Sequence, residues 1–162
     1  MNTQVKCISA DQYSNSMSPI QLQKTTINFS DNKLDVLSLV ILTDHKLEIS
    51  IYNEENNKGV LRLAFHDSDP NNKHNPHIAT EEQLFGEKRA NLIIDFVAEI
   101  KDKVDMLVVH CEAGVSRSPA IAAVLAKIHF GDDKAFFKAP FTPNMHVYRV
   151  MLDTAHARLG VL

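Results

Sequence analysis

Residues 110–118 read His-Cys-Glu-Ala-Gly-Val-Ser-Arg-Ser and hold the side chains best suited to covalent chemistry. Cys111 can act as a nucleophile through its thiolate. Arg117 follows six positions later, and its planar guanidinium can clamp two oxygens of one phosphate group. Gly114, at the centre of the gap, lets the backbone adopt a positive φ and come close to a ligand. These residue types at this spacing favour chemistry on a bound phosphate.

The elements predicted on either side of this segment explain how it could hold an anion. An apolar run predicts a strand over 105–110, and a helix is predicted to open near Ser116. A loop that leads into a helix N-terminus directs several backbone N–H groups at one point, and the helix dipole adds partial positive charge. The same groups would stabilise a thiolate at Cys111. Attack on a bound phosphoryl group would give a phosphocysteine that water then hydrolyses.

Strands and helices are predicted to alternate along the rest of the chain. Strands are expected over 5–8, 37–43 and 60–65, a strand or a helix start over 47–52, and a loop over 53–59. Because strands that alternate with helices form parallel sheets, we predict an α/β fold with a mostly parallel central sheet flanked by helices on both faces. The carboxyl ends of such strands are where ligands bind.

Capping signals predict where the helices begin and end. Thr80 with Gln83 forms a capping box, which predicts a helix of about 20 residues over 80–100. The segment 120–130 is apolar nearly all round and should be a buried helix ended by a glycine. A third helix is predicted to start at Thr142 and Pro143 and to end near residue 160.

Composition bounds the class of protein. The chain has 162 residues, of which 44% are hydrophobic and 23% charged, as expected of one globular domain over 1–162. Its two cysteines, Cys7 and Cys111, are too few for a disulfide scaffold or a four-cysteine zinc module. We interpret Cys7 as a small buried side chain, with a disulfide to Cys111 as the alternative. The net charge of −3 argues against a broad nucleic-acid surface.

The longest apolar run, at 36–42, is far shorter than the roughly 20 residues that span a bilayer. The first residues also lack the apolar stretch of a signal peptide. A cytoplasmic protein with no membrane partner is therefore expected.

The pattern His110-Cys111-x-x-Gly114-x-x-Arg117-Ser118 resembles the signature of the cysteine-dependent protein tyrosine phosphatases. The stretches Val-Leu-Arg-Leu-Ala-Phe-His-Asp at 60–67 and Pro-Asn-x-x-Val-Tyr-Arg at 143–149 resemble small, dual-specificity-like microbial members. The strong resemblance covers about residues 60–120. It implies a protein tyrosine phosphatase-like fold and hydrolysis of phosphomonoesters without a metal or cofactor. Phosphotyrosine is the implied substrate, with phosphoserine and phosphothreonine as further ones, on a phosphorylated protein or a small molecule.

The resemblance also assigns roles around the loop. Ser118 would hydrogen-bond the sulfur and help it leave, and His110 would orient the loop from beneath. Glu112 stands where lipid-directed relatives carry lysines, which argues against highly phosphorylated inositides. Backbone amides would bind the phosphate at Glu112, Ala113, Gly114, Val115, Ser116 and Arg117.

A general acid is needed to protonate the leaving oxygen. The family supplies an aspartate from a loop after an earlier strand, and here Asp67 and Asp69 follow the strand predicted over 60–65. The family's spacing favours Asp67, with Asp69 as the alternative. Both also suit a polar turn.

Three alternative hypotheses follow from the same residues. The first is a non-catalytic module that binds a phosphorylated partner, and the second is a phosphatase that acts on an RNA 5′-phosphate or a small phosphometabolite. The third is a transition-metal site, because the composition of 66–77 includes several possible ligands. Those ligands lack helical spacing, so we interpret them as a polar turn and predict no metal. They are His66, Asp67, Asp69, His74 and His77.

Overall fold

A computed structural model describes residues 7–8, 26–28, 37–43, 49–53, 58–72, 79–102, 106–111 and 114–160. Its strands are β1 (Cys7–Ile8), β2 (Thr26–Asn28), β3 (Leu37–Thr43), β4 (Ile49–Asn53), β5 (Lys58–Ala64) and β6 (Met106–His110). Its helices are α3 (Glu87–Ile100), α4 (Arg117–Phe130) and α5 (Met145–Leu159), with a short 3-10 helix η1 (Lys134–Phe137). Glu112, Ala113, His74 and His77 lie outside the described residues.

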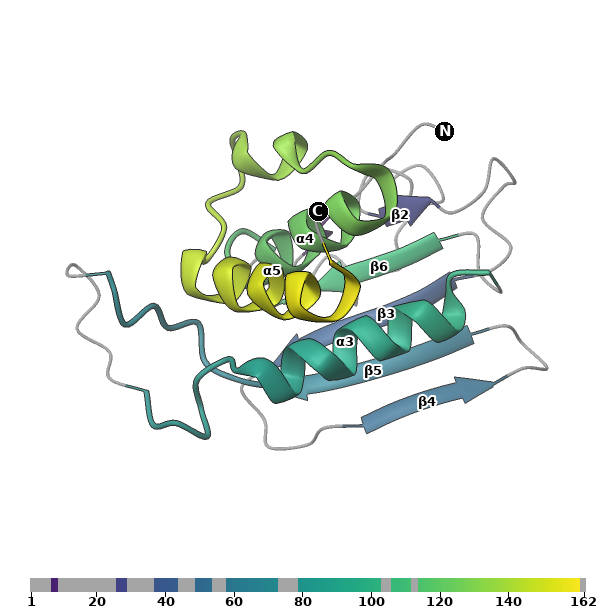
Figure 1. Ribbon diagram of the computed structural model, residues 1–162, viewed down its shortest axis with the longest axis horizontal. Coiled ribbons are helices and arrows are strands. Elements are labelled where there is room, and N and C mark those ends of the chain that lie inside the picture. The colour runs from purple at the N-terminus through teal and green to yellow at the C-terminus, as the bar shows by residue number, and fades with distance from the viewer. Residues whose placement is uncertain are drawn as a thin grey trace.

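The strands form one sheet in the order β1-β6-β3-β5-β4, with β2 also paired to β6 (Figure 1). Strands β1, β6, β3 and β5 pair in parallel, whereas β4 is antiparallel to β5 and β2 is antiparallel to β6. Parallel strands end at the same edge of a sheet, so the residues after β5 and β6 start at one edge with β3 between them. The protein tyrosine phosphatase-like fold class stays a prediction.

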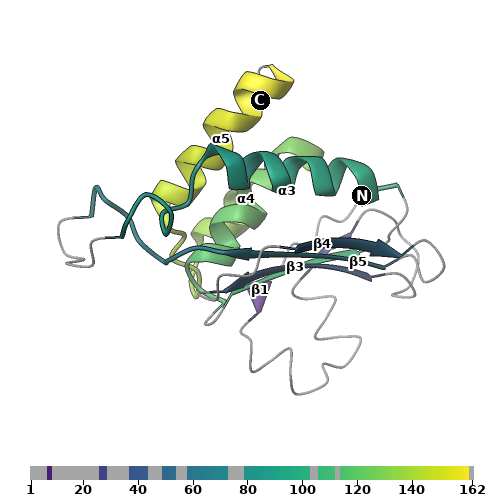
Figure 2. The same ribbon diagram turned by 90° about the horizontal axis from the view of Figure 1, so that it is seen from below.

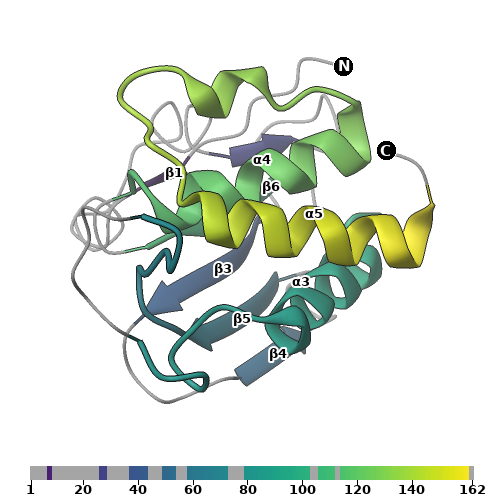
Figure 3. The same ribbon diagram turned by 60° about the vertical axis from the view of Figure 1, so that its left-hand side comes forward.

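The described helices cover one face of this sheet. Figure 2 shows α3, α4 and α5 on the same side of the strands, and helices on both faces of the sheet stay a prediction. Helix α4 contacts β1 and β6 and also contacts α5, which in turn lies beside α3 (Figure 3). Because α4 lies between the sheet and α5, every side chain over 117–126 is buried. This central position explains why α4 is apolar nearly all round.

Helix α3 is shorter than the sequence predicts, because it begins at Glu87 and not near Thr80. The capping box itself forms: the Thr80 amide donates to Gln83 Oε1 at 3.0 Å, and the Gln83 amide donates to Thr80 Oγ1 at 3.3 Å. However, the Gln83 carbonyl accepts a hydrogen bond from the His66 amide at 2.7 Å. That contact with the end of β5 makes 80–84 a separate turn, so the prediction of one continuous helix from 80 was wrong.

The start of α5 also differs from the prediction. The N-cap is Asn144, whose Oδ1 accepts a hydrogen bond from the Val147 amide at 3.1 Å, and not Thr142. The Thr142 amide instead donates to the Val115 carbonyl at 2.8 Å. The predicted ends of α4 and α5 are confirmed, since Gly131 and Gly160 are their C-caps with φ of 78° and 84°.

The strand boundaries need smaller corrections. β5 begins at Lys58, inside the predicted 53–59 loop, and 49–53 is a strand and not a helix start. β2 and η1 were not predicted. No helix in the described part of the chain is long and apolar enough to cross a membrane.

Candidate active site

Cys111 is the first residue after β6, and its sulfur lies at the N-terminus of α4. The Sγ atom accepts hydrogen bonds from the backbone amides of Gly114, at 3.3 Å, and Ser118, at 3.4 Å. It also lies 3.2 Å from the hydroxyl oxygen of Ser118. The side chain is only 2% exposed. Two backbone N–H groups and a hydroxyl group thus surround one sulfur atom.

Position 114 has a backbone conformation that glycine adopts readily and other residues disfavour. Gly114 has a φ of 73°, in the left-handed region, as the sequence predicted. This conformation turns the chain back so that the Gly114 amide faces the sulfur three residues earlier. The backbone amides of Gly114 and Ser118 thus both face the sulfur of Cys111.

The N-terminus of α4 is left open toward the loop. Ser116 is the N-cap residue, but its side chain makes no capping hydrogen bond, and the first turn carries no acidic side chain. The Ser116 hydroxyl instead donates to Asp67 Oδ1 at 2.8 Å. The partial positive charge of the helix is therefore not neutralised by the helix's own side chains, which suits an anion site.

The segment before α5 fixes the orientation of the loop peptides. The Thr142 amide donates to the Val115 carbonyl at 2.8 Å, and the Asn144 amide donates to the Ser116 carbonyl at 3.0 Å. In a trans peptide the C=O and the following N–H point in opposite directions. The amides of Ser116 and Arg117 therefore point away from 142–144. This geometry turns the loop into a set of donors, as an anion cradle requires.

Arg117 is held between the loop and the end of β5. Its Nη1 donates to the Phe65 carbonyl at 2.9 Å, and its guanidinium carbon lies 6.0 Å from the centre of the Phe65 ring. The side chain is 4% exposed, and Phe65 itself packs against Phe85 with ring centres 4.8 Å apart. The guanidinium direction is therefore set by a packed part of the core.

The two candidate aspartates make different contacts. Asp67 is exposed, yet its Oδ1 accepts hydrogen bonds from the Ser116 hydroxyl and from Asn144 Nδ2, both at 2.8 Å. Asp69 Oδ1 accepts from the Asn71 amide at 3.0 Å, which is a local turn contact. Asp67 is thus linked to the nucleophile loop, while Asp69 stabilises its own turn.

Asn144 is the site residue that sequence reasoning missed. Besides Asp67, its Nδ2 contacts the Ser68 carbonyl at 3.1 Å, so it joins the end of β5 to α5. A signal was present in the Pro-Asn pair at 143–144, but the sequence placed the helix cap at Thr142. Only the fold shows that the cap residue also reaches Asp67.

His110 is the last residue of β6 and is 6% exposed. Burial lowers the pKa of His110 from its usual value of 6.5, the nearby Arg62 lowers it further, and the backbone of Cys111 acts in the opposite direction. The ring is therefore neutral at pH 7. Its predicted role in orienting the loop stays a prediction.

Two polar side chains of α5 have hydrogen-bond partners outside the nucleophile loop. His146 Nε2 lies 2.8 Å from the Phe85 carbonyl, and the Tyr148 hydroxyl donates to Asp133 Oδ2 at 2.6 Å. Burial, together with Asp133, raises the pKa of Tyr148 to about 12. No group of three or more His, Cys, Asp or Glu residues that could hold a metal ion occurs within the described residues. Cys7 is opposite Val109 in the sheet, and its side chain lies outside what is described.

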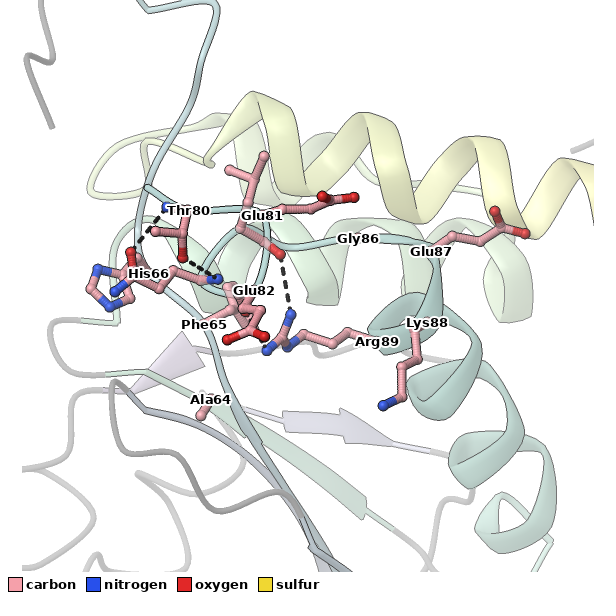
Figure 4. A pocket seen from close by; sticks show the side chains of 12 residues that line it. Ala64, Phe65, His66, Thr80, Glu81, Glu82, Gly86, Glu87, Lys88 and Arg89 are labelled. Atoms are coloured by element: carbon pink, nitrogen blue, oxygen red, sulfur yellow. Dashed lines mark hydrogen bonds between the residues drawn. The ribbon is translucent and has the colours of Figure 1, made fainter. Parts of the chain in front are cut away.

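A pocket of about 910 Å³ includes Phe65 and His66, the two residues before Asp67, in its lining (Figure 4). It is lined by the end of β5 and the residues that follow it, at Ala64 to His66, and by the turn and first helical residues from Thr80 to Arg89, apart from Phe85. Arg89 closes one wall, since its guanidinium donates to the carbonyls of Leu84, at 3.1 Å, and Glu82, at 2.8 Å. Cys111 and Arg117 are not among the lining residues, so the pocket adjoins the Asp67 segment rather than the nucleophile.

The chain was also compared with known proteins. No model of a protein family and no curated protein sequence matches it.

Proposed function

We propose that this protein is a cysteine-dependent phosphatase that hydrolyses phosphomonoesters through a phosphocysteine intermediate. One observation carries the proposal: the Cys111 sulfur accepts two backbone hydrogen bonds at the N-terminus of α4. Arg117 belongs to the same loop and donates to the Phe65 carbonyl, and Asp67, which follows β5, accepts a hydrogen bond from Ser116 of the loop. These contacts support the assignment of a nucleophile, a phosphate clamp and a proton donor to one site.

In the first step the Cys111 thiolate attacks phosphorus, the S–P bond forms, and the bond from phosphorus to the leaving oxygen breaks. Asp67, in its protonated form, gives its proton to that oxygen. Arg117 and the loop amides hold the three non-bridging oxygens, on which charge accumulates in the transition state.

In the second step Asp67, now a carboxylate, takes a proton from water as the water oxygen attacks phosphorus. The S–P bond breaks and the electron pair returns to sulfur. Ser118 supports that leaving thiolate, since its hydroxyl oxygen lies 3.2 Å from Sγ. The products are inorganic phosphate and the free enzyme, ready for another cycle.

The substrate class of the proposal is phosphotyrosine, with phosphoserine, phosphothreonine and small phosphomonoesters as further substrates. The amides and the arginine recognise the phosphoryl group itself, so the loop accepts any monoester whose phosphorus reaches Sγ. No cofactor takes part in the proposed reaction.

Hydrolysis of para-nitrophenyl phosphate tests the proposal directly. We expect turnover by the wild type in the presence of EDTA, and a loss on the order of 10⁵-fold or more in Cys111→Ser. Cys7→Ser is the matched control and should keep its activity. An acid-quenched reaction should contain a phosphorylated peptide that includes Cys111, identified by mass spectrometry. A wild type that is inactive, or a Cys111→Ser variant that still turns over, would overturn the proposal.

A further inference from the structure

Two donors converge on a single oxygen of Asp67. The Ser116 hydroxyl and the Asn144 amide nitrogen each lie 2.8 Å from Oδ1. A protonated carboxyl group has one oxygen that accepts and one that carries the proton. Because Oδ1 accepts from both donors, Oδ2 is the oxygen left to carry the proton.

The orientation of the Asn144 amide is fixed by its other contacts. Its Oδ1 accepts a hydrogen bond from the Val147 amide at 3.1 Å, as the N-cap of α5. The opposite side of the group must then be the NH₂, which donates to Asp67 Oδ1 and to the Ser68 carbonyl. The residue is 7% exposed, and its own backbone amide donates to the Ser116 carbonyl at 3.0 Å. The contacts of Oδ1 with Val147, of Nδ2 with Ser68 and of the backbone amide with Ser116 therefore hold the NH₂ group in place.

We propose that Asn144 is the positioning residue of the general acid, and that it presents Asp67 with Oδ2 as the proton-bearing oxygen. This inference rests on the proposed function. Asn144 joins the Asp67–Ser68 segment, the nucleophile loop and the first turn of α5. Asn144 holds Asp67 in a fixed position relative to the nucleophile loop before any substrate binds. This lowers the entropic cost of orienting the proton donor in the first step.

Replacement of Asn144 by serine separates the two roles of this side chain. Serine is as good an N-cap as asparagine, so the α5 contact is kept, but it is too short to reach Asp67. Proton donation matters more for a poor leaving group than for a good one. We therefore expect Asn144→Ser to lose about 10-fold in kcat with phenyl phosphate, as part of the roughly 10²–10⁴-fold that a general acid contributes. The loss with para-nitrophenyl phosphate should be smaller, and KM should be unchanged for both.

A double-mutant cycle with Asp67→Asn supplies the readout that a merely structural role would not move. If Asn144 acts through Asp67, the serine variant costs nothing further when the carboxyl group is absent. An equal loss from Asn144→Ser in the wild-type and Asp67→Asn backgrounds, or an equal loss with the two substrates, would overturn the inference.

Asn91→Ser is the matched control for the change of residue type. Asn91 lies on α3, where its Oδ1 accepts from Arg158 at 3.2 Å, and its replacement should leave both rates unchanged. The same assays include Cys111→Ser. A wild type without turnover that depends on Cys111 would overturn the proposed function and this inference together. Normal Cys111-dependent turnover, together with a loss from Asn144→Ser that is the same in the wild-type and Asp67→Asn backgrounds, would overturn only the inference.

Discussion

The nucleophile loop, residues 111–118, and the acid segment, residues 65–69, are built in different ways. In the nucleophile loop the contacts that hold the sulfur come from residues three and seven positions along the chain. In the acid segment, Asp67 is exposed and is held by partners 49 and 77 positions away. The sulfur of Cys111 is thus held by nearby backbone donors, whereas Asp67 is held by side chains from distant parts of the sequence.

This difference determines what kind of damage each region tolerates. The nucleophile loop should lose its function with every substrate when its backbone conformation is changed or when the Arg117 guanidinium is removed. A segment held by side chains can lose one contact and keep the rest, and the defect then depends on how much the substrate needs a proton. Four substitutions test this contrast.

Arg117→Lys should have the largest effect. Lysine cannot clamp two oxygens with one planar group, and it cannot keep both the phosphate and the Phe65 carbonyl. We expect kcat/KM to fall on the order of 10³-fold with phenyl phosphate and para-nitrophenyl phosphate alike. Steady-state kinetics with both substrates check this. A loss of kcat/KM with phenyl phosphate alone would mean that Arg117 acts in proton donation, as Asp67 does. That result would contradict the contrast between the two regions.

Asp67→Asn should lose about 10²–10³-fold in kcat with phenyl phosphate and only about 10-fold with para-nitrophenyl phosphate, whose leaving group needs little protonation. Asp69→Asn is the matched control, because Asp69 Oδ1 contacts the Asn71 amide and not the loop. It should stay within about 2-fold of the wild type with both substrates. The reverse result would assign the acid to Asp69.

Gly114→Ala should strain the loop, because alanine disfavours a φ of 73°. The expected cost is about 1–2 kcal/mol in the free energy of unfolding, measured in urea, together with lost activity. Gly160→Ala is also strained, at a φ of 84° and a ψ of −149°, but lies at the end of α5. It should lose stability and keep its rate. Equal activity in the two variants would show that the loop conformation is not needed.

The smallest effect concerns His110 and pH. Its pKa is lowered in the folded state, mainly by burial, so the unfolded chain binds this proton more readily. Stability from neutral His110 is present above pH 6.5 and is lost as pH falls toward the folded pKa, by less than about 1.4 kcal/mol per pH unit. His110→Gln should flatten the decline in unfolding free energy between pH 7 and pH 5. The exposed His156→Gln should not.

The same contrast explains which parts of the site could be predicted from sequence. Cys111, Gly114 and Arg117 were identified because their determinants lie within one segment: a strand, a glycine and a helix start. The choice between Asp67 and Asp69 stayed open because it depends on Ser116 and Asn144, which are distant in sequence.

Boundary errors have the same physical origin. The helix over 80–100 was predicted too long. The His66 amide donates a hydrogen bond to the Gln83 carbonyl, and this contact between distant segments is not visible in the local sequence. The α5 cap was assigned to Thr142 because Thr-Pro is a sound local signal, whereas the Thr142 amide pairs with Val115 across the fold. Local patterns gave the elements, and tertiary hydrogen bonds decided their ends.

The sheet register has a consequence for how such a protein could diversify. Ile41 of β3 is paired with His110 on one side and Arg62 on the other, so β6 ends level with Arg62 and β5 runs two residues further, to Ala64. These two strands lead to the two functional segments. They are separated by two strand spacings, about 9.6 Å, a distance set by backbone hydrogen bonds and independent of side chains. Insertions beyond residue 69 could deepen or narrow the entrance for a new substrate without changing that interval. The sheet would then keep the two segments at a constant spacing while the entrance to the site varies.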